Sequence, residues 1–107
     1  MTLLKLYDLI NNEELNAKYH DILRQWTMPV ILSLGSKNSG FNELKRGIKG
    51  INSTTLSSML SIFEKYNVVE REIIPSKPVK VKYSLTENGN KLYNIISSLA
   101  DFLIDLK

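Results

Sequence analysis

Five hydroxyl side chains lie within six consecutive positions in the middle of the chain: Ser53, Thr54, Thr55, Ser57 and Ser58. They belong to the stretch from Ile51 to Phe63, which carries no charge although charged residues make up 23% of the sequence. Because a hydroxyl group both donates and accepts hydrogen bonds, a row of them can bind phosphate oxygens or base edges. No set of nucleophile, base and acid accompanies these serines, and there is no glycine-rich phosphate loop or metal-ligand cluster. We therefore predict a binding role, with no catalytic residue, no metal and no cofactor.

Positive charge is concentrated around this neutral stretch. The chain has a net charge of +3, but residues 36–82 hold nine Lys and Arg residues against four acidic ones, a net charge of +5. The segments on either side, residues 1–35 and 83–107, each have a net charge of −1. Such clustering favours a polyanionic partner such as nucleic acid, although the solvated faces of many proteins look similar.

The composition limits what kind of protein this is. A length of 107 residues, 43% of them apolar, predicts a single domain over residues 1–107. The sequence holds no cysteine, which excludes disulfides, thiol redox sensing and cysteine-based zinc sites from this chain. No apolar run reaches the roughly 18 residues that a membrane span needs, and the N-terminus becomes acidic too soon for a signal peptide. We therefore expect a cytoplasmic protein without a membrane partner.

The neutral stretch has the periodicity of an amphipathic helix. Its apolar residues fall at positions i, i+3, i+4 and i+7: Leu56, Met59, Leu60 and Phe63. A flexible linker has no reason to keep such a stripe, so we predict a helix that begins near Asn52 or Ser53, both of which are suited to cap it. A shorter helix precedes it, because Phe41, Leu44 and Ile48 share one helical face before Gly50 interrupts the pattern.

Further helices are expected upstream. Apolar residues at near-helical spacing predict a helix over residues 13–24, and residues 2–10 predict an additional helical turn or two. The next helix is expected to contain Trp26 and the run Val30–Leu34, and to end at Gly35.

After the neutral helix the period changes from that of a helix to that of a strand. Residues 68–74 predict one strand, and a strictly alternating segment predicts a second, with Val79, Val81, Tyr83 and Leu85 on one face and Lys80, Lys82 and Ser84 on the other. Pro75 and Pro78 mark the turn between them, so we expect a β-hairpin with a basic outer face. Thr86 then caps a long apolar-striped helix that extends to about residue 106.

This order of elements predicts a mainly α protein with a β-hairpin, an α+β winged helix-turn-helix. The helix-turn-helix would occupy about residues 41–66, and the hairpin at about residues 68–85 would form the wing. The last helix has more apolar surface than a small domain covers by itself, which favours a symmetric helical interface between two copies.

Short motifs also follow one another in a characteristic order along about residues 13–106. They are Trp26 before the second helix, Phe41 to Leu44, Gly50 with Ile51, Ser53, Leu56 with Leu60, Pro75 with Pro78, and Tyr83 to Glu87 followed by Gly89. In this order and spacing the chain resembles the HxlR-type winged-helix transcriptional regulators, a branch related to the MarR family.

The resemblance implies a homodimeric regulator that binds double-stranded DNA. Its helix at about residues 53–66 would enter the major groove, while the wing tip would reach the flanking backbone or the minor groove. The expected DNA-binding residues are Lys49, Ser53, Thr54, Thr55, Ser58, Lys65, Lys77, Lys80 and Lys82. The helices at about residues 13–24 and 86–106 would form the dimer through Leu15, Tyr19, Ile22, Leu99, Phe102, Leu103 and Leu106. The resemblance names no small-molecule effector.

The neutral recognition helix departs from the family, whose members usually carry basic residues there. Two other functions therefore stay open at this point. One is a winged-helix protein interaction module with weak or no DNA affinity, and the other is a dimer whose cleft binds a small ligand.

Overall fold

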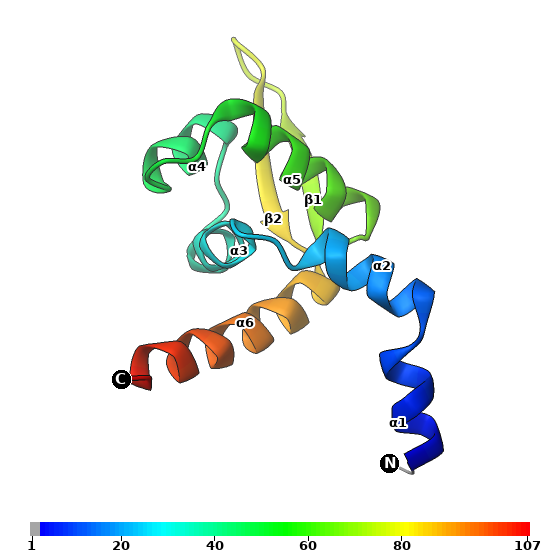
Figure 1. Ribbon diagram of the computed structural model, residues 1–107. Coiled ribbons are helices and arrows are strands. Elements are labelled where there is room, and N and C mark those ends of the chain that lie inside the picture. The colour runs from blue at the N-terminus through cyan, green and yellow to red at the C-terminus, as the bar shows by residue number, and fades with distance from the viewer. Residues whose placement is uncertain (1–2) are drawn as a thin grey trace.

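The structure, a computed structural model, describes residues 3–107. Its elements follow in the order α1 (Leu3–Ile10), α2 (Glu13–Ile22), α3 (Thr27–Ser36), α4 (Phe41–Gly47), α5 (Ser53–Lys65), β1 (Val69–Ile74), β2 (Lys80–Leu85) and α6 (Glu87–Asp105). Helices α3, α4 and α5 surround the centre of the domain, the hairpin β1–β2 lies beside them, and α1 and α6 extend away from it (Figure 1). The predicted mainly α fold with a β-hairpin wing is confirmed.

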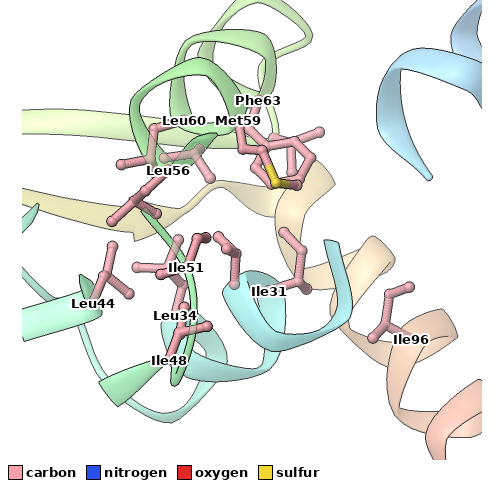
Figure 2. Close-up of a cluster of buried hydrophobic side chains, with 13 residues drawn as sticks. Ile31, Leu34, Leu44, Ile48, Ile51, Leu56, Met59, Leu60, Phe63 and Ile96 are labelled. Atoms are coloured by element: carbon pink, nitrogen blue, oxygen red, sulfur yellow. The ribbon is translucent and has the colours of Figure 1, made fainter. Parts of the chain in front are cut away.

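The core lies where the three central helices meet. Its buried side chains are Val30, Ile31 and Leu34 from α3, Leu44 from α4, Leu56, Met59, Leu60 and Phe63 from α5, Ile96 from α6, and Ile48, Ile51, Val68 and Val69 from the connecting segments and β1. Figure 2 shows the α5 side chains pointing toward α3 and α4. The predicted stripe of the neutral helix is therefore the side by which α5 is anchored, because burying these groups is the main favourable contribution to folding.

Helix α5 begins one residue after its cap. Asn52 takes the cap position, where its side-chain oxygen accepts a 2.8 Å hydrogen bond from the Thr55 backbone N–H. The turn before it is tight, and Gly50 adopts a positive φ of 87° that residues with a side chain rarely take. Ser53 is consequently the first helical residue, and the whole row of hydroxyl residues falls within the first two turns of α5.

Helix α3 differs from its prediction at both ends. Trp26 is the cap residue and precedes the helix, and Gly35 lies inside it, because α3 continues to Ser36. The reason for Gly35 is packing against α6: a Cβ at this position would overlap the ring of Tyr93. The glycine thus allows α6 to lie close to α3 and does not end the helix.

The wing is a two-stranded antiparallel hairpin tied to the loop before α4. Its register runs from the pair Val69 and Leu85 to the pair Ile74 and Lys80. Ser39 and Tyr83 exchange two backbone hydrogen bonds of 3.1 and 2.8 Å, so the α3–α4 loop is attached to β2. Tyr83 and Leu85 pack against the core as predicted, but Val79 does not, because it lies beyond the sheet near the tip and is 62% exposed.

The outer face of the wing is not uniformly basic. Lys82 lies directly opposite Glu72, and Ser84 lies opposite Glu70, which accepts a 3.4 Å hydrogen bond from the serine hydroxyl. Opposite charges placed across a strand pair attract each other and offset one another's field. The prediction of a basic outer face is therefore wrong for the base of the hairpin, since the cross-strand register brings two carboxylates onto it.

Helix α6 is capped by Thr86, whose hydroxyl oxygen accepts a 3.0 Å hydrogen bond from the Gly89 N–H. Gly89 packs so tightly against the carbonyl oxygen of Val68 that a Cβ would overlap it. Further along, Ile96 is the one hydrophobic residue of α6 in the buried core. The large apolar residues after it are exposed, as expected for a helix with more apolar surface than this domain covers.

Candidate nucleic-acid interface

Helix α5 presents its hydroxyl groups on the side away from the core. Ser53, Thr54, Ser57 and Ser58 are exposed, whereas Thr55 is half-buried at the edge of the stripe. Two backbone N–H groups of the first turn are already used, because Asn52 accepts from Thr55 through its side chain and from Leu56 through its carbonyl. The donors at this end of the helix are therefore the exposed hydroxyls together with the backbone N–H groups of Ser53 and Thr54.

Two of the predicted lysines lie at opposite ends of this helix. Lys49 is exposed in the turn before α5, next to the hydroxyl row. Lys65 is the last residue of α5, about 18 Å along the axis from Ser53 at 1.5 Å per residue. Its ammonium group lies 5.5 Å from the centre of the Tyr66 ring, a cation–π contact. The structure does not bring Lys65 together with the hydroxyl groups.

The wing lysines lie beside α4. Lys80 and Lys82, together with Val81, form one wall of a cavity of about 470 Å³, and residues 40–43 and Arg46 form the other. Lys77 is exposed in the turn at the tip. Arg46 was not among the predicted site residues, although its position off the apolar face of α4 is visible in the sequence. The structure thus adds a third cation to this groove.

The groove also contains a carboxylate. The ammonium group of Lys37 lies 3.1 Å from Glu43, and the Gly40 N–H donates to the same carboxylate over 3.3 Å. The hydrogen bond from Lys37, followed by that from Gly40, lowers the pKa of the Glu43 carboxyl, so this group stays ionised. Because Lys37 balances most of this negative charge, Arg46, Lys80 and Lys82 still leave the groove positive.

A second cavity lies against the N-terminal half of α5. It has a volume of about 400 Å³ and is lined by Thr54, Thr55, Ser58 and Met59 from α5 and by Arg24, Gln25 and Trp26 from the α2–α3 connection. Three hydroxyl residues that are predicted to bind DNA therefore share a surface with Arg24. Sequence reasoning missed this arginine because thirty positions separate it from Thr54, and no local pattern links the two segments.

The predicted dimer residues are distributed over two exposed helices. Exposed side chains are Leu15 and Tyr19 on α2, Leu99, Phe102 and Leu103 on α6, and Leu106 directly after it. Ile22 differs from them because it is half-buried and packs against the core of its own chain. These exposed side chains thus lie on or next to α2 and α6, the helices predicted to mediate contact with a second copy, and α1 adds further exposed apolar residues.

Within residues 3–107, no helix is both long and apolar enough to cross a membrane. Over the same residues, no three His, Cys, Asp or Glu side chains are grouped so that they would hold a metal ion.

Comparison with known proteins identifies the family. Residues 22–106 match the HxlR-like helix-turn-helix family model. An uncharacterized HTH-type transcriptional regulator of Halalkalibacterium halodurans, BH0655, is 38% identical over 79 residues, which cover 73% of this chain and 70% of that protein. The HTH-type transcriptional regulator YodB of Bacillus subtilis is 32% identical over 76 residues, covering 71% of this chain and 68% of its own.

Solved structures agree with this assignment. The diamide-treated form of YodB from B. subtilis superimposes with a TM-score of 0.74 and 27% identity, covering 84% of this chain and 89% of that one. The redox regulator HypR in its oxidized form gives a TM-score of 0.79 with 26% identity, covering 88% and 97%. With its winged helix-turn-helix fold and a family match over residues 22–106, this chain belongs to the HxlR-like helix-turn-helix family of transcriptional regulators.

Proposed function

We propose that this protein is a sequence-specific DNA-binding regulator that works as a homodimer. The observation that carries the proposal is the division of α5 into two sides. Its apolar stripe is fixed in the core, and its row of hydroxyl residues is left exposed at the N-terminal end. A helix held in this way can place short polar side chains against base edges in a major groove without bending its own backbone.

Affinity for the DNA backbone must come from the neighbours of α5, because the exposed face of its first two turns carries no charge. Lys49 lies at the start of the helix, and Arg46, Lys80 and Lys82 lie in the groove between α4 and the wing. Cations in such positions release counterions from phosphates on binding, which makes affinity fall as salt rises. In this proposal α5 selects the sequence, and the surrounding cations provide most of the binding strength.

The dimer in this proposal is formed by the apolar sides of α2 and α6. A symmetric pair of these domains would place two α5 helices in successive major grooves, about 34–36 Å apart. The support for this arrangement is the row of exposed apolar residues that follows Ile96 on α6. An isolated chain would leave these side chains in water, where they favour association.

Binding to duplex DNA across a salt series tests the proposal. We expect the wild-type protein to bind random-sequence duplexes at low salt, with a steep negative slope of log affinity against log salt. Selection of duplexes from a random pool should then yield an inverted repeat, because a symmetric dimer reads two equivalent half-sites. If the protein binds no duplex at low salt, the DNA-binding proposal is wrong and the protein-interaction alternative gains support.

A second experiment tests whether the hydroxyl residues of α5 recognise the DNA sequence. Thr54→Ala combined with Ser58→Ala should lower the preference for the selected duplex over random DNA, while leaving the salt slope unchanged. Ser98→Ala, a change at an exposed serine of α6, should alter neither quantity. If the double variant keeps the full preference for the selected duplex, other residues must recognise the sequence.

A further inference from the structure

We infer that Arg24 contacts the DNA backbone at the edge of α5 opposite the wing, and that Asp21 and Tyr66 are its positioning residues. The inference rests on the proposed DNA-binding function and adds a contact to it. It starts from the cavity of about 400 Å³ in which Arg24 faces Thr54, Thr55 and Ser58.

The two edges of α5 are defined by contacts near its C-terminal end. On one edge, Glu64 pairs with Arg71 of β1 over 3.6 Å. On the other, Tyr66 donates a hydrogen bond to Asp21 of α2. Positions two residues apart point about 200° away from each other around a helix axis. Helix α5 is therefore flanked by the wing on one side and by the α2–α3 connection, with Arg24, on the other.

The backbone at Arg24 is fixed by a buried side chain. The hydroxyl of Thr27, which is only 2% exposed, accepts a 2.9 Å hydrogen bond from the Arg24 N–H and donates a 2.5 Å hydrogen bond to the carbonyl of Ile22. One threonine thus holds both sides of the bend between α2 and α3. The position from which the arginine side chain projects is set by the fold.

The side chain of Arg24 is oriented as well. One guanidinium nitrogen lies 3.5 Å from Asp21 Oδ1, and Asp21 Oδ2 accepts a 2.6 Å hydrogen bond from Tyr66. The Arg24 side chain is 41% exposed, so it is not enclosed by this contact. Because a guanidinium group carries five N–H donors in one plane, contact with a single carboxylate oxygen leaves donors for another acceptor.

A phosphate of the DNA backbone is the acceptor that suits this surface. Arginine can bind two oxygens of a phosphate at once, and such a contact would hold the strand beside the hydroxyls of Thr54 and Ser58, which are proposed to face its bases. The neutral recognition helix lacks a cation of its own at this edge, and Arg24 is the one that lines the cavity. The recognition helix would then have phosphate contacts along both edges, with the wing and α4 on one and Arg24 on the other.

Salt dependence of binding to a random-sequence duplex tests the inference, since each phosphate contact contributes about 0.9 to the slope of log affinity against log salt. Arg24→Gln should reduce the magnitude of the slope by about 0.9, which amounts to about a threefold smaller loss of affinity between about 50 and 200 mM salt. Arg24→Lys keeps the charge and should restore a slope near that of the wild type. Lys91→Gln removes an exposed cation from α6 and should leave the slope unchanged.

The outcomes separate this inference from the proposed function. If the wild type shows a steep slope and Arg24→Gln has the same slope, the Arg24 contact is wrong and DNA binding stands. If the wild type binds no duplex at low salt, both proposals are wrong. A slope reduced equally by Arg24→Gln and Lys91→Gln would indicate a general effect of net charge, which also overturns the contact. Circular dichroism of each variant confirms that the measured protein is folded.

Discussion

The hydroxyl of Tyr66 donates a 2.6 Å hydrogen bond to Asp21 Oδ2, across 45 positions of sequence. This bond joins α2, a helix of the proposed dimer, to the end of α5, the proposed recognition helix. The hydrogen bond from Tyr66 lowers the pKa of the Asp21 carboxyl below its ordinary value of 3.8. In turn, the bond to Asp21 raises the pKa of the Tyr66 hydroxyl above 10.0.

Tyr66→Phe should destabilise the protein in a pH-dependent way. A carboxyl with a lowered pKa contributes stability above its ordinary value of 3.8 and loses it as pH falls through the folded-state pKa. A hydroxyl with a raised pKa contributes below 10.0 and loses the contribution as pH rises through the folded-state pKa. The difference between wild type and variant in unfolding free energy should therefore be constant between these limits and shrink outside them.

Urea unfolding at a fixed protein concentration over this pH range measures the difference. Tyr7→Phe, at a tyrosine that is 64% exposed on α1, is the matched control and should leave stability almost unchanged at every pH. The ring is the same in both proteins, so a Tyr66→Phe effect that persists undiminished at the acid end would show that the hydroxyl does not act through the ionised Asp21 carboxylate.

Two glycines should respond to alanine in opposite ways. Gly89→Ala forces a Cβ into the carbonyl oxygen of Val68, and a backbone atom cannot move aside as a side chain does, so we expect a loss of about 1–3 kcal/mol or more. Gly47→Ala meets nothing within 4 Å at the end of α4 and should stabilise the protein by about 0.4–1 kcal/mol. Thermal unfolding of both variants checks this pair. Equal effects at the two positions would contradict the packing of α6 against the segment at Val68.

Substitutions on the two sides of α5 should have different effects: those on the buried side should lower the stability of the protein, and those on the exposed side should alter DNA recognition. Leu56→Ala removes a fully buried side chain and should cost about 2–5 kcal/mol. Thr54→Ala changes an exposed position and should shift stability by no more than about 0.5 kcal/mol. Denaturant unfolding and competition between selected and random duplexes are measured on the same samples. A Thr54→Ala variant that unfolds as readily as Leu56→Ala would contradict the assignment of the two sides.

The wing should contribute to affinity through Lys80 and Lys82. The double variant Lys80→Ala and Lys82→Ala should reduce the magnitude of the salt slope by up to about 1.8, or 0.9 for each phosphate contact. Glu72→Gln removes the carboxylate that lies opposite Lys82 and should strengthen binding to random duplexes. Unchanged affinity in the double variant would show that the wing does not touch the backbone.

Association of two copies should depend on the exposed end of α6. Phe102 is 60% exposed, and Phe102→Glu places a charge on the apolar surface, which should shift the protein toward monomers in light scattering at micromolar concentration. Asn94→Glu adds the same charge at an exposed polar position of α6 and should leave the mass unchanged. A wild-type protein that is monomeric under these conditions would remove the dimer from the proposal.

Periodicity was sufficient to predict the elements and most of the core. The stripe from Leu56 to Phe63 is visible in the sequence because burial on one side of a helix imposes its own spacing. Spacing does not indicate which helix another will contact. The sequence therefore predicts a helix end at Gly35, whereas the structure shows that this glycine is where Tyr93 packs.

The site was harder to predict than the fold, because its electrostatics depend on tertiary register. Glu72 opposes Lys82 only once the two strands are aligned, and Arg24 lies beside Thr54 only once α2 and α5 are packed. Charge counted along the chain correctly indicated a basic region. It overestimated the positive field of the wing and overlooked a cation that comes from an overall acidic segment.

The backbone pairing of Ser39 with Tyr83 has a mechanical consequence for the wing. It anchors the hairpin at its base, next to the core, whereas the tip around residues 75–79 extends beyond the paired strands. A hairpin held in this way behaves as a lever with a fixed pivot, so that bending is concentrated at its free end. In the proposed DNA complex, grooves of different width would be met by movement of the tip alone, while the proposed recognition helix α5 keeps its angle.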